Sequence, residues 1–168
     1  MTSTSVLNHF LREIPWCTDR VVFWDQINHQ TVPKGKMTII DIETYSSQNV
    51  GHFSVVDRRN PKLDYFFGPY GLDAQTARRI LNMKYQENAD INALTKILTV
   101  PYSYNHIDWQ SIYLPDGEAD NLCGVYSLLY CLNEGDQNLF TSVAPRQQFD
   151  EELTVWARHH GLLSTQDF

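Results

Sequence analysis

The chain has 168 residues, 42% hydrophobic and 12% aromatic, a composition typical of a single globular domain spanning residues 1–168. Its net charge of -7 argues against a broad nucleic-acid-binding surface, because such surfaces are normally basic. No apolar run approaches the ~18 to 20 residues of a membrane span, and the N-terminal stretch lacks a signal peptide's long apolar region. We therefore expect a protein of a reducing compartment, neither secreted nor associated with a membrane.

The cysteine pattern indicates neither a disulfide framework nor a metal site. The chain has three cysteines, Cys17, Cys123 and Cys131, an odd number without metal-type pairing. Cys123 and Cys131 are separated by two helical turns, so their sulfurs should lie too far apart to bridge. Cys131 with His159 and His160 has no recognisable ligand spacing, and a solvated histidine pair at a helix end is the simpler interpretation. We expect no metal and no cofactor.

The first half of the chain predicts one helix followed by strands. Apolar spacing predicts a helix over residues 5–14, ended by Pro15. Residues 21–27 are compatible with either a short helix or a strand. A turn at residues 57–62 allows the third of the predicted strands to return antiparallel to the second. The predicted strands are residues 37–45, 52–56 and 63–67.

The second half is mainly helical. Asp73 is expected to cap a helix over residues 74–85, after glycines and a proline at 68–71 interrupt regular structure. The later expected elements are a helix at 91–98, a strand-like piece within 101–110, an exposed loop at 115–121, a central helix at 121–133 and a C-terminal helix. Phe149, Leu153 and Trp156 mark that last helix, with acidic residues 150–152 in its first turn and Gly161 as its stop.

Two basic clusters interrupt the otherwise acidic composition. One comprises Arg58, Arg59 and Lys62, and the other is the pair Arg78 and Arg79. We interpret the first as a solvated turn and the second as a solvated helix face.

The stretch 121–133, N-L-C-G-V-Y-S-L-L-Y-C-L-N, has the features of a nucleophile site. Asn121 is a good N-cap residue, and apolar residues at helical spacing follow it, so Cys123 falls in the first turn of a buried helix. Unpaired N–H groups and the helix dipole there favour the thiolate, and Gly124 removes side-chain bulk beside the sulfur. The alternative is that Cys123 is simply a buried small residue.

A cysteine nucleophile needs a base and donors for the oxyanion. His52 stands out among six histidines because it opens a strand after a Val-Gly loop and precedes an aromatic residue. Gln110, in W-Q-S, could donate its side-chain amide to the oxyanion, together with the backbone N–H of Cys123. Taken singly, such a histidine is more often structural and such a glutamine more often solvated.

In chain order, G-H-F at His52, a hairpin ending F-F-G-P-Y-G, Gln110 and then Cys123-Gly124 resemble the adenovirus-type endopeptidase family, adenain. That family belongs to the clan that includes SUMO-deconjugating proteases. The opening L-R-E-I-P-W-C-T-D-R-V-V-F-W-D is also similar to the N-terminal segment of the family, so the resemblance covers about residues 5–133.

The resemblance implies a viral maturation-type cysteine endopeptidase that cleaves precursor virion proteins through a thioester acyl-enzyme. Cys123 would be the nucleophile, His52 the general base and Gln110 the oxyanion-hole donor. The implied architecture is an α+β fold in which a central mixed or antiparallel sheet is flanked by helices and a buried helix carries the nucleophile at its N-terminus. The implied protein is a monomer that acts on polypeptides in the virion and the host cell interior.

Gly68 departs from the family pattern, which places an acid or amide there to orient the histidine. If the hairpin pairs symmetrically about residues 59–60, position 68 faces His52 and the orienting side chain is missing from the site. Asp64 would lie roughly 13 Å away along the strand. Asp73 could instead fold back, or a water or backbone carbonyl could hold the imidazole.

Two further departures concern the segment before the nucleophile. Gln110 stands 13 positions before Cys123, about twice the family's interval, which enlarges the loop at 115–121. Residues 91–109 contain no cysteine, so the family's covalent link to an activating peptide is not expected. Activation by a peptide or a nucleic acid stays open. Two alternatives also stay open: a catalytically degenerate, virion-associated binding protein, and a deconjugase of ubiquitin-like modifiers.

Overall fold

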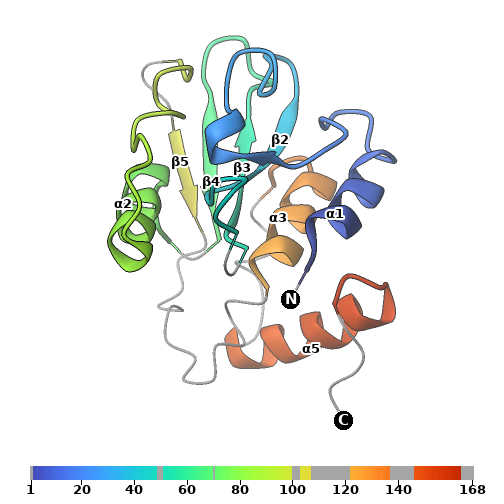
Figure 1. The fold of residues 1–168 in the computed structure, drawn as a ribbon. Coiled ribbons are helices and arrows are strands. Elements are labelled where there is room, and N and C mark those ends of the chain that lie inside the picture. Colours follow the sequence, from blue (N-terminus) through green and yellow to red (C-terminus); the bar gives the residue numbers. More distant parts are fainter. Residues whose placement is uncertain are drawn as a thin grey trace.

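The structure is a computed structural model that describes residues 2–48, 51–69, 71–99, 103–106, 122–136 and 146–163. Its helices lie around a five-stranded mixed sheet (Figure 1), which confirms the predicted α+β class. The strands are β1 Val22–Phe23, β2 Met37–Asp41, β3 Phe53–Asp57, β4 Tyr65–Gly68 and β5 Ser103–His106. The helices are α1 Thr4–Leu11, the 3-10 helix η1 Trp24–Gln26, α2 Ala74–Tyr85, α3 Cys123–Leu132 and α5 Arg146–His159.

The sheet topology brings several chain segments to one end of the sheet. Its strands follow sequence order, with β1 parallel to β2, an antiparallel β2-β3-β4 meander, and β5 parallel to β4. The predicted antiparallel return of residues 63–67 is therefore confirmed. The end of β2, the start of β3 and the N-terminus of α3 all lie at the lower end of the sheet in Figure 1.

The register of the hairpin differs from the predicted one. Val55 pairs with Phe67, which centres the hairpin on Pro61. The expectation that Gly68 faces His52 is wrong, because this register places position 68 opposite Ser54 when it is continued by one pair. A turn centred about one residue later than expected shifts every pairing by two positions.

Helices cover both faces of the sheet, and two apolar cores result. Alternate residues of β2, β3 and β4 contribute to each core, because successive side chains of a strand point to opposite faces. On one face Met37, Ile39, Phe53, Val55 and Phe67 pack against α1, α3 and α5. On the other face Ile40, Val56 and Phe66 pack against α2, Trp24, Leu94 and Leu98.

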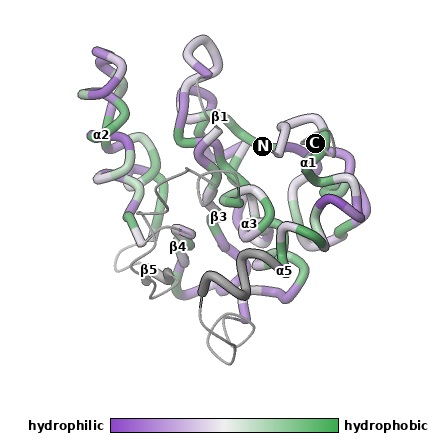
Figure 2. The backbone as a smooth tube through the Cα atoms, turned by 90° about the horizontal axis from the view of Figure 1, so that it is seen from below, coloured by the Kyte–Doolittle hydropathy of each residue, from purple (hydrophilic) through white to green (hydrophobic). Residues whose placement is uncertain are grey.

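Helix α3 is the most deeply buried helix element described, and it lies between β3 and α1 in the view of Figure 2. Eight of its ten residues are buried: Cys123, Gly124, Val125, Tyr126, Ser127, Leu128, Tyr130 and Cys131. The Tyr130 ring stacks on Phe67 of β4 with centroids 4.1 Å apart, and Trp16 Nε1 donates to the Cys131 carbonyl at 2.8 Å. These contacts fix the helix against the sheet.

The helix begins later than predicted. Its N-cap is Leu122, which makes no side-chain capping bond, so the expectation that Asn121 caps it is wrong. Asn121 itself lies outside the described residues. Cys123 is nevertheless in the first turn, as predicted, because the apolar periodicity that buries the helix continues to its first residue.

Other elements agree in part. Helix α2 and its Asp73 cap occupy the predicted positions. Residues 91–97 form turns instead of a helix, since Asp90 and Thr95 side chains bond local backbone groups. Residues 21–27 contain both a two-residue strand and the 3-10 helix.

The C-terminal helix differs from the prediction at its start. Helix α5 begins at Arg146, so the acidic residues 150–152 lie beyond its first turn. Gly161 follows the end of the helix with a positive φ of 77°.

The interpretation of the basic clusters as solvated was wrong for two of the arginines. Arg58 is 2% exposed, pairs with Asp64 at 3.4 Å and donates to the Val32 and Ile97 carbonyls. Arg78 is fully buried and donates to the Ile42 carbonyl at 2.8 Å. Both guanidinium groups satisfy backbone carbonyls that loops leave unpaired, a role that composition does not reveal.

Candidate active site

Cys123 lies at the first residue of α3, against the loop that precedes β3. Its thiol donates a hydrogen bond to the Gly51 carbonyl oxygen, with Sγ and the oxygen 3.2 Å apart. The two residues are 72 positions apart in sequence. The sulfur belongs to the apolar core on this face, and Cys123 is only 2% exposed. The fold therefore brings the predicted nucleophile against the residue that immediately precedes the predicted base.

His52 is half-buried and its backbone is held at the end of β2. Its carbonyl accepts the Ile42 N–H at 2.8 Å, and its own N–H donates to the Asp41 carboxyl group. The structure thus places the Cys123 thiol in contact with the backbone of Gly51, the residue before His52. Gln110, the third predicted site residue, lies outside the described residues.

Two buried acids that sequence reasoning missed hold this loop. The Gly51 N–H donates to Glu43 Oε1 at 2.5 Å, and the Glu43 N–H donates to Asp41 Oδ1 at 2.9 Å. Both acids are 1% exposed. The available signal was their alternation with isoleucine in I-I-D-I-E, which puts two acidic side chains on one face of a buried strand. Strand β2 ends at Asp41 and not at residue 45 as predicted. The Asp41 carboxyl group accepts the backbone N–H of Glu43, and this local hydrogen bond competes with pairing between strands.

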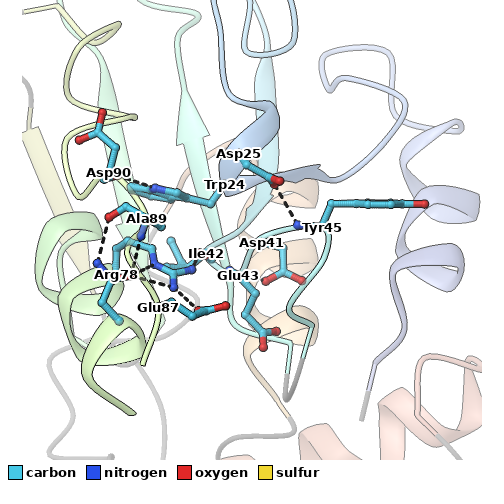
Figure 3. Close-up of polar contacts among 11 residues, drawn as sticks. Trp24, Asp25, Asp41, Ile42, Glu43, Tyr45, Arg78, Glu87, Ala89 and Asp90 are labelled. Atoms are coloured by element: carbon cyan, nitrogen blue, oxygen red, sulfur yellow. Dashed lines mark hydrogen bonds and ion pairs between the residues drawn. The ribbon is translucent and has the colours of Figure 1, made fainter. Parts of the chain in front are cut away.

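The two carboxyl groups form a coupled pair, and Figure 3 shows them close together. Burial raises the pKa of Asp41 to about 8; the Glu43 N–H opposes that rise, and the charge of Glu43 adds to it. The side chains are also hydrogen-bonded to each other. At neutral pH the Asp41 carboxyl group therefore retains its proton.

A cavity of about 390 Å³ lies beside this pair. Ser3, Ser5 and Gln48 are exposed at its rim, whereas its floor is buried. The lining residues are Thr2, Ser3, Thr4, Ser5, Asp41, Glu43, Gln48, Gly51 and Phe53. Among these described residues, Asp41 and Glu43 are the only ionisable ones.

Gly124 allows close packing at the start of α3. A Cβ at this position would stand 3.0 Å from Thr2 Cβ and 3.2 Å from the Phe53 ring. Thr2 and Phe53 already fill the space that a side chain at position 124 would occupy.

None of the three positions considered for an orienting acid supplies one. A Cβ on Gly68 would lie 2.2 Å from the Leu72 carbonyl oxygen, so no side chain fits there. Asp64 pairs with Arg58, and Asp73 caps α2 by accepting the Thr76 N–H at 2.7 Å. The carboxyl groups that do contact the His52 loop are those of the Asp41 and Glu43 pair.

A scan against protein-family models finds no matching family, and no curated protein matches the chain. The resemblance to adenain therefore stays a prediction based on motifs. Among the helices in the described ranges, none has the length and apolar character to cross a membrane. Within those ranges, no three His, Cys, Asp or Glu side chains are grouped as metal ligands.

Proposed function

We propose that the chain is a cysteine endopeptidase in which the helix α3 carries the nucleophile, Cys123, and the loop before β3 carries the general base, His52. The observation that supports this most directly is the 3.2 Å contact between Cys123 Sγ and the Gly51 carbonyl oxygen. It places the helix terminus against the residue that precedes His52, so that the proposed nucleophile and the proposed base come from adjoining segments. Gln110 keeps its proposed role as oxyanion donor.

The contact also defines what activation must change. A sulfur that donates to a carbonyl oxygen is a protonated thiol, so this is a resting arrangement. Turning Sγ away from Gly51 by rotation about the Cα–Cβ bond would free it for His52 to accept its proton. The thiolate would attack the peptide carbonyl, expel the amine protonated by His52, and leave a thioester that water then hydrolyses.

The substrate class follows from the resemblance to adenain. We propose precursor virion proteins as substrates, cleaved in the virion or the host cell interior by a monomer that needs no cofactor. A peptide or a nucleic acid could serve as activator by displacing the Cys123 thiol from Gly51.

Cleavage of a peptide library, read by mass spectrometry, tests the proposal. The wild-type chain should produce new peptide termini, and Cys123→Ala and His52→Ala should abolish them. Cys131→Ala is the matched control, because Cys131 is a fully buried thiol on the same helix. Equal cleavage by wild type and Cys123→Ala would overturn the assignment.

A catalytically inactive binding protein is the second candidate. Two observations favour it: the 2% exposure of Cys123 and the lack of room for an orienting acid at Gly68. Alkylation by iodoacetamide at neutral pH distinguishes the two. Selective, His52-dependent labelling of Cys123 supports the peptidase, whereas labelling no faster than that of Cys131 supports the binding protein.

A further inference from the structure

Residues 2–3 precede helix α1 and form a short strap beside the nucleophile. Thr2 is 2% exposed, although it is polar and lies outside the helix. Its side chain packs on the start of α3, where a Cβ at Gly124 would stand 3.0 Å from Thr2 Cβ and 3.3 Å from Thr2 Cγ2. Gly124 directly follows Cys123, so the strap lies against the helical turn that carries the thiol.

The strap also adjoins the residue that holds the thiol. Thr2 and Gly51 line the same cavity of about 390 Å³, and the Gly51 carbonyl oxygen accepts the Cys123 thiol at 3.2 Å. Phe53 lines this cavity too, and its ring would stand 3.2 Å from a Cβ at Gly124. Of these described neighbours, Thr2 is the one that comes from outside the sheet region and α3. It is therefore the neighbour that can leave without disturbing the core.

Few interactions hold the strap in place. Thr2 Oγ1 is buried without a hydrogen-bond partner in the described structure, so the burial of Thr2 carries a cost that the burial of a valine would not. Ser3 is exposed and caps α1, because its side chain accepts the Val6 N–H at 3.2 Å. Leu7 and Leu11 anchor the helix separately in the core. Rotation of the backbone between residues 2 and 3 would move Thr2 away while α1 stays on the sheet.

We propose that the strap is an autoinhibitory contact, in which Thr2 seated on Gly124 keeps Cys123 out of reach and exposes it on leaving. A peptide that binds across Cys123 takes the place of the strap, so binding carries the cost of opening and the resting thiol is protected. The regulatory role rests on the proposed peptidase function. The control of the strap over the accessibility of Cys123 is measured without any cleavage.

The rate at which iodoacetamide alkylates Cys123 in the folded full chain tests the strap, with Cys131 as the internal control. When closing is fast, this rate follows the population of the locally open state. Thr2→Gln introduces a neutral side chain too large for the contact with Gly124, and it should raise the rate at Cys123 at least about tenfold. Cys131 is fully buried in the core and should keep its rate.

Thr2→Val should act in the opposite direction. It keeps a branched side chain of similar shape and removes the unpartnered hydroxyl, so the rate at Cys123 should fall at least about threefold. Both substitutions are neutral, so neither favours the thiolate through charge. Ser5→Gln is the matched control, because Ser5 is exposed in the first turn of α1, and it should leave the rate unchanged.

Two results would overturn the inference. One is a Thr2→Gln chain in which Cys123 is alkylated at the wild-type rate, and the other is a chain in which Cys123 and Cys131 are alkylated faster together, which indicates general loosening. If Thr2→Gln fails to fold, Thr2→Val decides the matter, because a rate at or above that of wild type contradicts the strap.

Cleavage separates this inference from the proposed function. If Thr2→Gln speeds the alkylation of Cys123 but neither chain cleaves peptides, the strap stands and the peptidase is refuted. If the wild-type chain cleaves in a Cys123-dependent manner while both Thr2 variants are alkylated at the wild-type rate, the strap is refuted and the peptidase stands.

Discussion

Glu43 and Gly51 are joined by a 2.5 Å hydrogen bond from the glycine N–H to the carboxylate, and the carbonyl of the same glycine accepts the Cys123 thiol. Gly51 has a φ of 68°, a left-handed conformation that other residues rarely adopt. The loop that carries His52 is therefore held in one conformation by a buried acid on one side and by α3 on the other.

Replacing Glu43 with alanine should loosen that loop. The Gly51 N–H would lose its buried acceptor, at a cost of about 1–3 kcal/mol in unfolding free energy. Cleavage should fall at least about tenfold because His52 is no longer held in place. Glu43→Gln retains an acceptor oxygen and should recover part of the stability, as measured by urea unfolding. A Glu43→Ala chain as stable as one carrying the exposed control Glu13→Ala would contradict this account.

Asp41 should make stability decrease with pH. The unfolded chain releases its proton near the ordinary pKa of 3.8, whereas the folded chain retains it up to about 8. The folded state thus binds more protons between these values, and stability falls across pH 4–8 by on the order of 5 kcal/mol. Asp41→Asn should remove this decline, which urea unfolding at pH 5 and pH 8 will show. Parallel pH profiles for the two chains would refute the assignment of the decline to Asp41.

Gly68→Ala should be strongly destabilising, although the adenain family has a residue with a side chain at this position. The new Cβ would stand 2.2 Å from the Leu72 carbonyl oxygen, so the backbone must shift at a cost of about 3 kcal/mol or more. Gly35→Ala is the matched control, because nothing lies within 4 Å of its Cβ and only its φ of 88° is strained. The control should lose about 1 kcal/mol. Similar thermal unfolding midpoints for both variants would contradict this prediction, because they would mean that the backbone of the turn after β4 shifts at little cost in free energy.

Arg78 and Arg79 are adjacent in sequence but should differ sharply in effect. Arg78 is fully buried, donates to the Ile42 carbonyl and pairs with Glu87 (Figure 3), whereas Arg79 is exposed. Arg78→Ala should cost about 3–5 kcal/mol, since it leaves buried polar partners unpaired. Arg79→Ala should change stability by less than about 0.5 kcal/mol. Chemical denaturation of both variants checks this, and a small loss for Arg78→Ala would show that water replaces its contacts.

Some of the fold could be predicted because its cause is local in the chain. Helix α2 occupies the residues that its spacing and its Asp73 cap predicted, and Cys123 lies in the first turn of α3. In both cases the signal and the structure lie within one stretch of chain, where helical periodicity and capping act. The α+β class follows from the sum of such local signals.

The arrangement of the candidate site depended on contacts between distant segments. Three features result from packing that no local pattern records. They are the hairpin register about Pro61, the burial of Arg58 and the interaction of Asp41 with Glu43. By itself the sequence determined which residues could be nucleophile and base, through residue type and helix position. Only the tertiary structure decided that Cys123 lies against Gly51, because burial and hydrogen bonding across the sheet edge bring those segments together.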